Sequence, residues 1–155
     1  MYPLLKLLHV AAAVIFLGNI ITGLFWHAHA ARTRDPKLLA HTMVGIIRSD
    51  RWFTIPGVVG LVVAGVGLAI AGRLPIVRTG WILWSVVALT LSGVIFAVRV
   101  APLQRALLAL AGAAAAGTFD YGRYRALSMQ WEIWGGAALL TPLAAFALMV
   151  LKPWP

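Results

Sequence analysis

Apolar residues fall in four long runs along the chain, separated by segments that carry almost all of the charged side chains. A helix needs about 20 apolar residues to cross a bilayer, because the hydrocarbon core is ~30 Å thick and each residue rises ~1.5 Å. Four runs meet this requirement: 7–26, 53–72, 80–98 and 133–151. Backbone groups cannot stay unpaired in lipid, so we expect each run to be a membrane-spanning α-helix.

The segments between these runs differ in length. Residues 73–79 form a short loop, which predicts that the second and third spans make a tight hairpin. Residues 27–52 contain Asp35-Pro36, a typical helix start, followed by apolar residues at helical spacing. Residues 103–131 end in aromatic residues that recur on one helical face. We expect both long segments to form short helices that lie at the membrane surface.

Small or polar residues recur on one face of each span, at alternating spacings of three and four. The second span has Gly57, Gly60 and Gly67 on such a stripe, and small residues let membrane helices approach closely. The first span has His9 and Asn19 on one stripe, and polar side chains in lipid face the bundle interior. The predicted fold class is therefore all-α: one domain covering the whole chain, with four transmembrane helices in an antiparallel bundle.

Composition agrees with a membrane protein. The chain is 62% hydrophobic and 11% charged, whereas a soluble domain is roughly half apolar and a quarter charged. These values exclude an ordinary soluble enzyme, a disordered chain and a coiled coil. The absence of cysteine excludes disulfide frameworks, zinc fingers and thiol catalysis. We attribute the net charge of +9 to basic segments held against anionic lipid headgroups, and we expect no nucleic-acid partner.

The basic residues are unequally divided between the two sides of the predicted bundle. Nine of the 13 Lys and Arg residues lie in or beside the two long connecting segments, and the other four lie at the opposite end. Cytoplasmic loops of membrane proteins carry an excess of Lys and Arg. The distribution predicts that the long segments are cytoplasmic and that both chain termini lie outside.

His9 is the ionisable residue that lies clearly inside a span, and such a residue suggests a function. A neutral imidazole can ligate haem or copper. Met149 lies at the same predicted depth, and haem iron accepts a His/Met pair. The alternatives are a histidine hydrogen-bonded to a neighbouring helix and a methionine that fills core space. No other span contains a histidine, so we do not expect bis-histidine haem ligation.

Three further polar residues are expected to be structural. Asn19 is predicted to form a packing hydrogen bond within the bundle. Arg99 and Glu132 lie at the inner edges of the third and fourth spans, where we expect them to form an ion pair.

Other charged residues are assigned to the membrane surface. The run Asp50-Arg51-Trp52 is typical of an interfacial belt. His27, His29 and His41 lie near the same edge, where a solvated segment is favoured over transient copper binding. The chain contains no phosphate-binding loop, catalytic triad or zinc motif.

Six motifs are spread along nearly the whole chain: Leu5-Lys6-Leu7-Leu8-His9-Val10, Gly18-Asn19, Asp50-Arg51-Trp52-Phe53-Thr54-Ile55-Pro56-Gly57, Gly80-Trp81, Pro102-Leu103-Gln104-Arg105 and Met149-Val150-Leu151-Lys152-Pro153. Together they resemble a bacterial family of small predicted integral membrane proteins of unknown function. The resemblance implies a multi-pass protein of the bacterial inner membrane, and it brings no established activity.

The motif Leu8-His9-Val10, followed by small residues, more distantly resembles the first helix of two larger groups. One is the copper-resistance D type of membrane protein, and the other is the membrane-bound, haem-associated protoporphyrinogen oxidase of bacteria. This resemblance implies a role for His9, which matches the first-helix histidine of the oxidase. The oxidase group also carries a lysine in a later helix, whereas the third span here has none.

Three functions are consistent with these observations. The first is an accessory membrane protein that binds haem b, or copper as second choice, through His9. The second is a membrane redox enzyme that acts on a porphyrin or a quinone. The third is an assembly partner whose glycine stripe packs against a second copy or another membrane protein. The lipid bilayer is the one partner common to all three.

Overall fold

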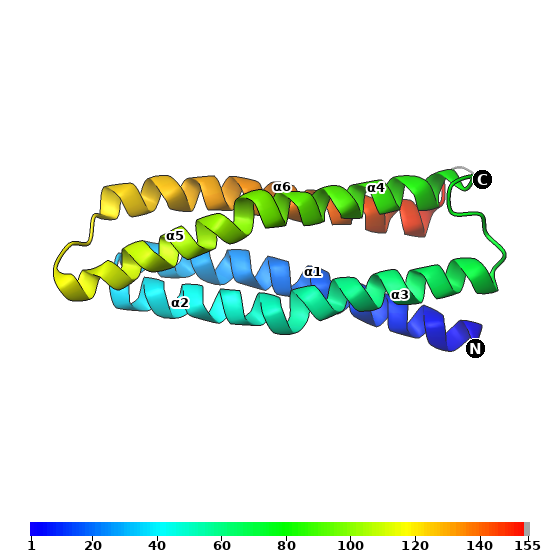
Figure 1. Cartoon of the computed structure of the whole chain (residues 1–155), viewed down its shortest axis with the longest axis horizontal. Helices are drawn as coiled ribbons and strands as arrows, with labels where there is room; N and C mark the ends of the chain where they lie inside the picture. Colours follow the sequence, from blue (N-terminus) through cyan, green and yellow to red (C-terminus); the bar gives the residue numbers. More distant parts are fainter. Residues whose placement is uncertain (154–155) are drawn as a thin grey trace.

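The computed structural model describes residues 1–153, without the side chains of residues 115 and 116, and consists of four long helical rods packed antiparallel (Figure 1). The first rod is α1 (Tyr2–Thr33) and the fourth is α6 (Tyr121–Leu151). The second comprises α2 (Pro36–Ser49), η1 (Asp50–Thr54) and α3 (Ile55–Ala71), and the third comprises α4 (Gly80–Ile95), η2 (Phe96–Val100) and α5 (Ala101–Gly112). A short 3₁₀ turn, η3 (Ala113–Ala116), follows α5. Each rod is long and apolar enough to cross a membrane, so the predicted fold class is confirmed.

The segments predicted to lie along the membrane surface are helical, but they continue the spans instead of turning aside. α2 runs into α3 through the π-helical turn η1, and α4 runs into α5 through η2. Each turn ends just before a proline, Pro56 or Pro102. A proline inside an α-helix clashes with the carbonyl four residues back and lacks an N–H. The wider turn before it, in which Ile55 N–H bonds the Asp50 carbonyl, lets the rod continue.

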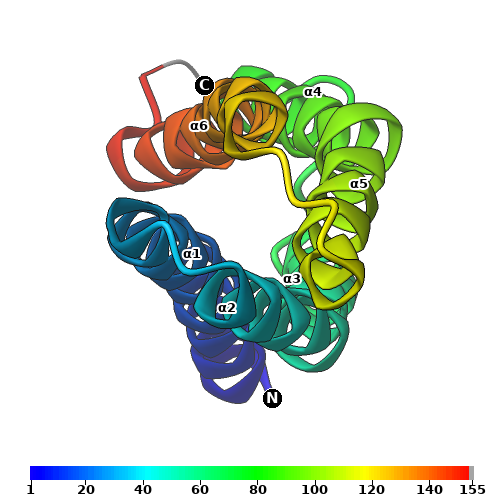
Figure 2. The ribbon, with the colours of Figure 1, turned by 90° about the vertical axis from the view of Figure 1, so that its left-hand side faces the viewer.

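The helices change partners along the length of the bundle. Over one half, α1 packs on α3 and α4 packs on α6 as two separate pairs. Over the other half, α1, α2, α5 and α6 pack in a closed ring, which is seen end-on in Figure 2. We call the first the apolar half and the second, which holds most of the Arg residues, the basic half.

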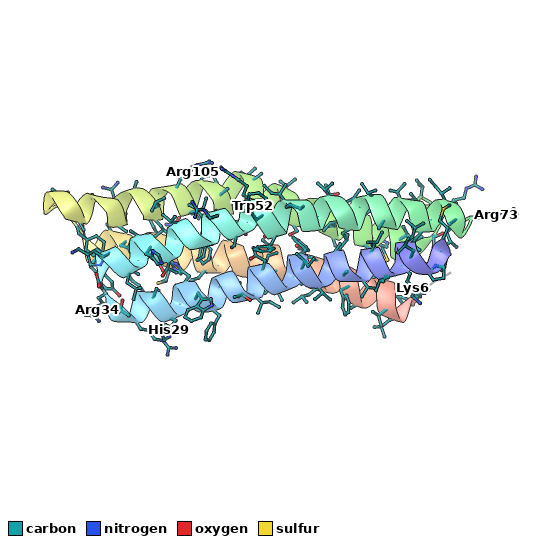
Figure 3. All side chains as sticks on the ribbon, turned by 90° about the horizontal axis from the view of Figure 1, so that it is seen from below. Lys6, His29, Arg34, Trp52, Arg73 and Arg105 are labelled. Carbon is teal, nitrogen blue, oxygen red and sulfur yellow. The ribbon has the colours of Figure 1, made fainter. Side chains whose placement is uncertain are left out.

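The apolar half has large hydrophobic side chains on its outside. Examples from three of its helices are Val63, Trp84 and Leu140, each more than half exposed. From Trp52 to Arg73 the second rod rises about 30 Å, the thickness of the hydrocarbon core. Lys6 and Arg73 lie at the end of this half (Figure 3). An exposed apolar belt of this height, closed by cations, is typical of the part of a protein that spans the bilayer.

Proline also shapes the pairing of α4 with α6. Pro142 lies inside α6 and leaves the carbonyl of Ala138 without its helical N–H partner. The hydroxyl of Ser92 on α4 donates to that carbonyl at 2.7 Å. A second serine of α4, Ser85, donates to the carbonyl of Ala145 at 3.2 Å. The freed backbone group is therefore satisfied inside the bundle, as a lipid surrounding requires.

The basic half has its large side chains on the inside. Leu39 and Met43 of α2 pack with Leu107 of α5 and with Tyr124 and Trp131 of α6, and all five are almost fully buried. This cluster continues the helices about 20 Å beyond the apolar belt, because α2 has 14 residues.

Candidate functional site

A buried carboxylate lies where the two halves meet. Asp50 is 8% exposed and belongs to the π-helical turn η1. Its Oδ1 accepts hydrogen bonds from Asn19 Nδ2 of α1 at 3.1 Å and from Thr54 Oγ1 at 2.8 Å. Its Oδ2 accepts one from Gln104 Nε2 of α5 at 2.7 Å. Asn19 Nδ2 also lies 2.8 Å from Thr54 Oγ1, so side chains from three rods form one network around this carboxylate.

This network has donors on every side and no cation. Asn19, Thr54 and Gln104 all present N–H or O–H groups to Asp50. Within residues 1–153, the ion pair between an arginine and a carboxylate is Arg125–Glu132, and it does not reach Asp50. An isolated ionised carboxylate is costly inside a membrane protein unless it is paired or functional. The arrangement is suited to exchange a proton or to accept a hydrogen bond from a bound molecule.

A cavity of about 210 Å³ lies against this network. Asn19, Asp50, Thr54 and Gln104 line one part of it, and most of the remaining wall is apolar, including Leu89 of α4. The exposed residues in the wall are Ile55 and Val59 of α3 and Gly93 of α4. Because α3 and α4 belong to different pairs of the apolar half, the cavity opens sideways between them, towards lipid.

Trp131 of α6 also lines the cavity, and its side chain is 3% exposed. The indole Nε1 is buried, and no hydrogen-bond acceptor in the described part of the chain reaches it. Because this atom has almost no accessible surface, Trp131 contributes apolar surface to the cavity wall and not a hydrogen-bond donor.

A second polar network lies deeper in the basic half. The Nε2 of His27 is 2.8 Å from Ser128 Oγ, which donates to Glu132 Oε1 at 2.9 Å. Arg125 donates to the same carboxylate oxygen at 3.1 Å. The order of groups differs from a catalytic triad, because the carboxylate bonds the serine and not the imidazole. These hydrogen bonds connect His27, which is 1% exposed, to the partly exposed carboxylate of Glu132.

His9 forms a contact between two helices. Its Nδ1 lies 2.9 Å from the carbonyl of Leu61 on α3, and a Cβ on Gly65 would come within 3.0 Å of its ring. Gly65 therefore leaves the space that the imidazole fills. This contact corresponds to the structural alternative for His9. Ligation of haem or copper by His9 stays a prediction.

The structure does not bring Met149 to His9. α1 packs on α3 and α6 packs on α4 over the apolar half. At that end the first residues of α1 and the last residues of α6 lie apart in two views (Figures 1 and 2). Within the described residues, no group of three or more His, Cys, Asp or Glu side chains is placed to hold a metal ion.

Two charged residues predicted to pair do not do so. The guanidinium of Arg99 lies over the ring of Trp134, 5.2 Å from its centroid. Glu132 bonds Arg125 and Ser128 instead. Both hydrogen-bond partners of Glu132 lie on its own helix, one and two turns earlier, because the chain enters the fourth span as a continuous helix. The predicted ion pair between Arg99 and Glu132 is therefore wrong.

The predicted glycine stripe of α3 faces α1 of the same chain. A Cβ on Gly57 would lie 3.1 Å from Phe16, one on Gly60 would lie 3.5 Å from Ala12, and one on Gly67 would lie 3.3 Å from Leu5. The stripe is thus covered within the monomer and does not present a free surface to a second chain.

Two residues assigned to the surface from the sequence are buried. Asp50 was expected in the interfacial belt with Trp52, yet only Trp52 is exposed. His27 was expected in a solvated segment with His29 and His41, and only the last two are exposed. Both errors have one cause. Residues 27–52 were expected to leave the bundle and lie along the membrane surface, whereas they continue the helices of the bundle. Gln104 belongs to the motif Pro102-Leu103-Gln104-Arg105, which supported the family resemblance but gave the residue no role, and Ser128 carried no signal beyond being a polar residue in a helical segment.

These features define the class: a multi-pass integral membrane protein in which four helices enclose a buried polar network. The chain belongs to the family described as predicted integral membrane protein (DUF2269), whose model matches residues 3–153. This match confirms the family resemblance and gives no support to a likeness with copper-resistance D proteins or protoporphyrinogen oxidase. No curated protein and no solved structure matches the chain.

Proposed function

We propose that the protein binds a lipid-soluble molecule with a hydroxyl-bearing ring, of the phenol or quinol class, in the cavity beside Asp50. The observation that carries this proposal is the cavity itself, which joins a buried carboxylate to an opening on the lipid side. The ring occupies the cavity, and an apolar tail leaves between α3 and α4.

The hydrogen-bonding capacity left on Asp50 supports a ligand that donates. A carboxylate has about four acceptor positions, and the neighbours of Asp50 occupy three of them. A hydroxyl group on the ligand can donate to the fourth. An aliphatic molecule without a polar head would exclude water from this position and supply no donor, at a cost of about 1–3 kcal/mol.

The size of the cavity supports a single ring over a porphyrin. Pockets for drug-sized ligands measure about 300–1,000 Å³, and this cavity measures about 210 Å³. Of the two ligand classes considered for a redox enzyme, the quinol therefore fits better. His9 and Met149, the residues suggested for haem, do not line this cavity.

The proposal is tested by equilibrium binding of duroquinol to the purified protein in a neutral detergent, measured by quenching of tryptophan fluorescence. Its dimethyl ether, which has no O–H donor, is the control ligand. We expect saturable binding of duroquinol and about tenfold weaker binding to Asp50→Asn, because a hydrogen bond to a charged group contributes about 1.5–3 kcal/mol. Asp35→Asn is the matched control, since Asp35 is an exposed N-cap and asparagine caps equally well.

Three results would remove the proposal. They are the absence of saturable binding, equal affinity for duroquinol and its dimethyl ether, and equal affinity of the Asp50→Asn and Asp35→Asn variants. Ala138→Leu, which places a larger side chain in the cavity wall, should abolish binding. The thermal unfolding temperature of each variant distinguishes a lost site from a lost fold.

We further infer that the basic half lies on the cytoplasmic side of a bacterial inner membrane, with both termini outside. The excess of Lys and Arg at that end supports this orientation. Because the chain has no cysteine, single cysteines report position cleanly. In spheroplasts, a membrane-impermeant maleimide should label Val77→Cys, in the α3–α4 loop, and should label Thr118→Cys only after permeabilisation. The reverse pattern would invert the orientation.

A further inference from the structure

A second concave site lies on the outer surface of the bundle, between α2 and α5. It is an open depression with a volume of about 400 Å³, which we call the arginine groove, and it is lined by Val44, Ile47, Arg48, Arg51, Trp52 and Leu108. The first five come from α2 and η1, and Leu108 comes from α5. Arg105 of α5 lies one turn from Leu108 and near the level of Trp52 (Figure 3).

The cations of the arginine groove have no acidic partner. In the part of the chain that the structure describes, the arginine that pairs with a carboxylate is Arg125, which bonds Glu132 on α6. The acid nearest in sequence, Asp50, is buried and bonded to Asn19, Thr54 and Gln104. Arg48 and Arg51 are both exposed and stand one turn apart on the same rod. The groove is therefore a concentrated positive surface that the protein itself does not neutralise.

The arginine groove lies at the level of lipid headgroups. Trp52 is 70% exposed and begins the apolar belt, which continues with exposed Phe53 and Ile55. Tryptophan is enriched at the boundary between headgroups and acyl chains. On the other side of Trp52, α2 and α5 lie beyond the belt. A molecule in this groove thus has its polar part beside arginine and its apolar part beside α3.

We propose that the arginine groove binds the phosphate of an anionic phospholipid from the leaflet on the basic side. Guanidinium groups bind phosphate oxygens with paired N–H donors, which an ammonium group cannot do. The glycerol backbone lies against Trp52, and the acyl chains run along the exposed side chains of α3. Basic pockets between membrane helices bind acidic headgroups in this way. This site is separate from the cavity beside Asp50, because no residue lines both.

The test measures lipid binding to the full chain in a neutral detergent by native mass spectrometry. The probes are dihexanoyl phosphatidylglycerol, dihexanoyl phosphatidylcholine and inorganic phosphate. The test variant is the double substitution Arg48→Gln with Arg51→Gln. The matched control is Arg32→Gln with Arg123→Gln, which removes the same net charge from exposed positions at the far end of the basic half.

We expect phosphatidylglycerol to bind the native protein more tightly than phosphatidylcholine. The test variant should lose about 30-fold in affinity for phosphatidylglycerol, because it lacks two arginines that each contribute to the binding of an anionic lipid. The control variant should stay within about twofold, since its arginines lie more than a Debye length of about 8–10 Å from the groove.

Other results would overturn the proposal. An equal loss in both variants would show that net charge alone attracts the lipid. Equal binding of the two phospholipids would remove the specificity for an anionic headgroup. If millimolar inorganic phosphate displaces phosphatidylglycerol completely, the groove is a site for soluble phosphate and not for lipid. Unchanged duroquinol binding in the test variant separates this site from the one beside Asp50.

Discussion

The two halves of the bundle are packed by different kinds of side chain. In the apolar half, the α1–α3 contact is made at Gly57, Gly60 and Gly67, and large side chains such as Val63 point outward. In the basic half, the large side chains are inside, and Leu107 is fully buried. Along the same four rods, the large apolar side chains therefore change from the outside of the bundle to the inside.

The reversal follows from the change of solvent. An apolar side chain gains no hydrophobic free energy when it moves from lipid into a helix interface. Helices in lipid therefore associate through close contact at small residues. In water, the burial of apolar surface drives association, and large side chains contribute most. The cavity beside Asp50 lies at the level where paired helices give way to a four-helix ring. A site at this level is open to lipid on the side of the apolar half and has packed helices as its walls on the side of the basic half.

The largest expected effect tests whether the basic half is held together by burial. Leu107→Ala should lower the free energy of unfolding by about 2–5 kcal/mol, because it removes buried methyl groups and leaves a cavity. Leu107 contacts the central cluster of the basic half. The measurement is SDS-induced unfolding in mixed micelles, followed by tryptophan fluorescence.

Leu140→Ala is the matched control for this substitution. Leu140 lies on α6 in the apolar half and is 67% exposed, whereas Leu107 has no exposed surface. The control should change the free energy of unfolding by less than about 0.5 kcal/mol. Equal effects of the two substitutions would contradict the division of the molecule into two halves.

The sequence predicts the apolar half well because lipid imposes simple rules. Long apolar runs must be helices there, and the small residues of the second span mark its contact face, as Gly57 and Gly60 illustrate. The basic half could not be read in the same way. Its helices alternate apolar and polar positions, a pattern shared by a helix on the membrane surface and a helix standing upright in a bundle.

Asp50 shows why the candidate site was not found from the sequence. Its neighbours Arg51 and Trp52 are typical of a membrane boundary, and both are exposed. Asp50 and Thr54 lie four residues apart and face the same side as the buried residues of α2 that precede them, as ordinary helical spacing requires. The site was missed because this segment was expected to lie along the membrane surface, and helical spacing alone does not tell whether such a face packs against lipid or against other helices. The partner Gln104 lies on another rod, so its role depends on packing alone.

A smaller loss of stability is expected from a substitution at the α1–α3 contact of the apolar half. If close contact at small residues holds α1 against α3, one added methyl group should separate them. In Gly57→Ala, the new Cβ would stand 3.1 Å from the Cβ of Phe16 and 3.3 Å from its backbone nitrogen and Cα. Backbone atoms cannot rotate away, so we expect overpacking to cost about 1–3 kcal/mol in the same unfolding measurement.

Gly18→Ala separates this steric effect from helix propensity. Gly18 lies in α1, and a Cβ there meets nothing within 4 Å. Alanine favours a helix over glycine by about 0.8–1.0 kcal/mol, so the control should be neutral or slightly stabilising, and the same gain offsets part of the cost at Gly57. The difference between the two variants therefore measures the contact itself. Equal unfolding free energies would mean that the α1–α3 interface yields to a methyl group, and that the apolar half depends on something other than close approach.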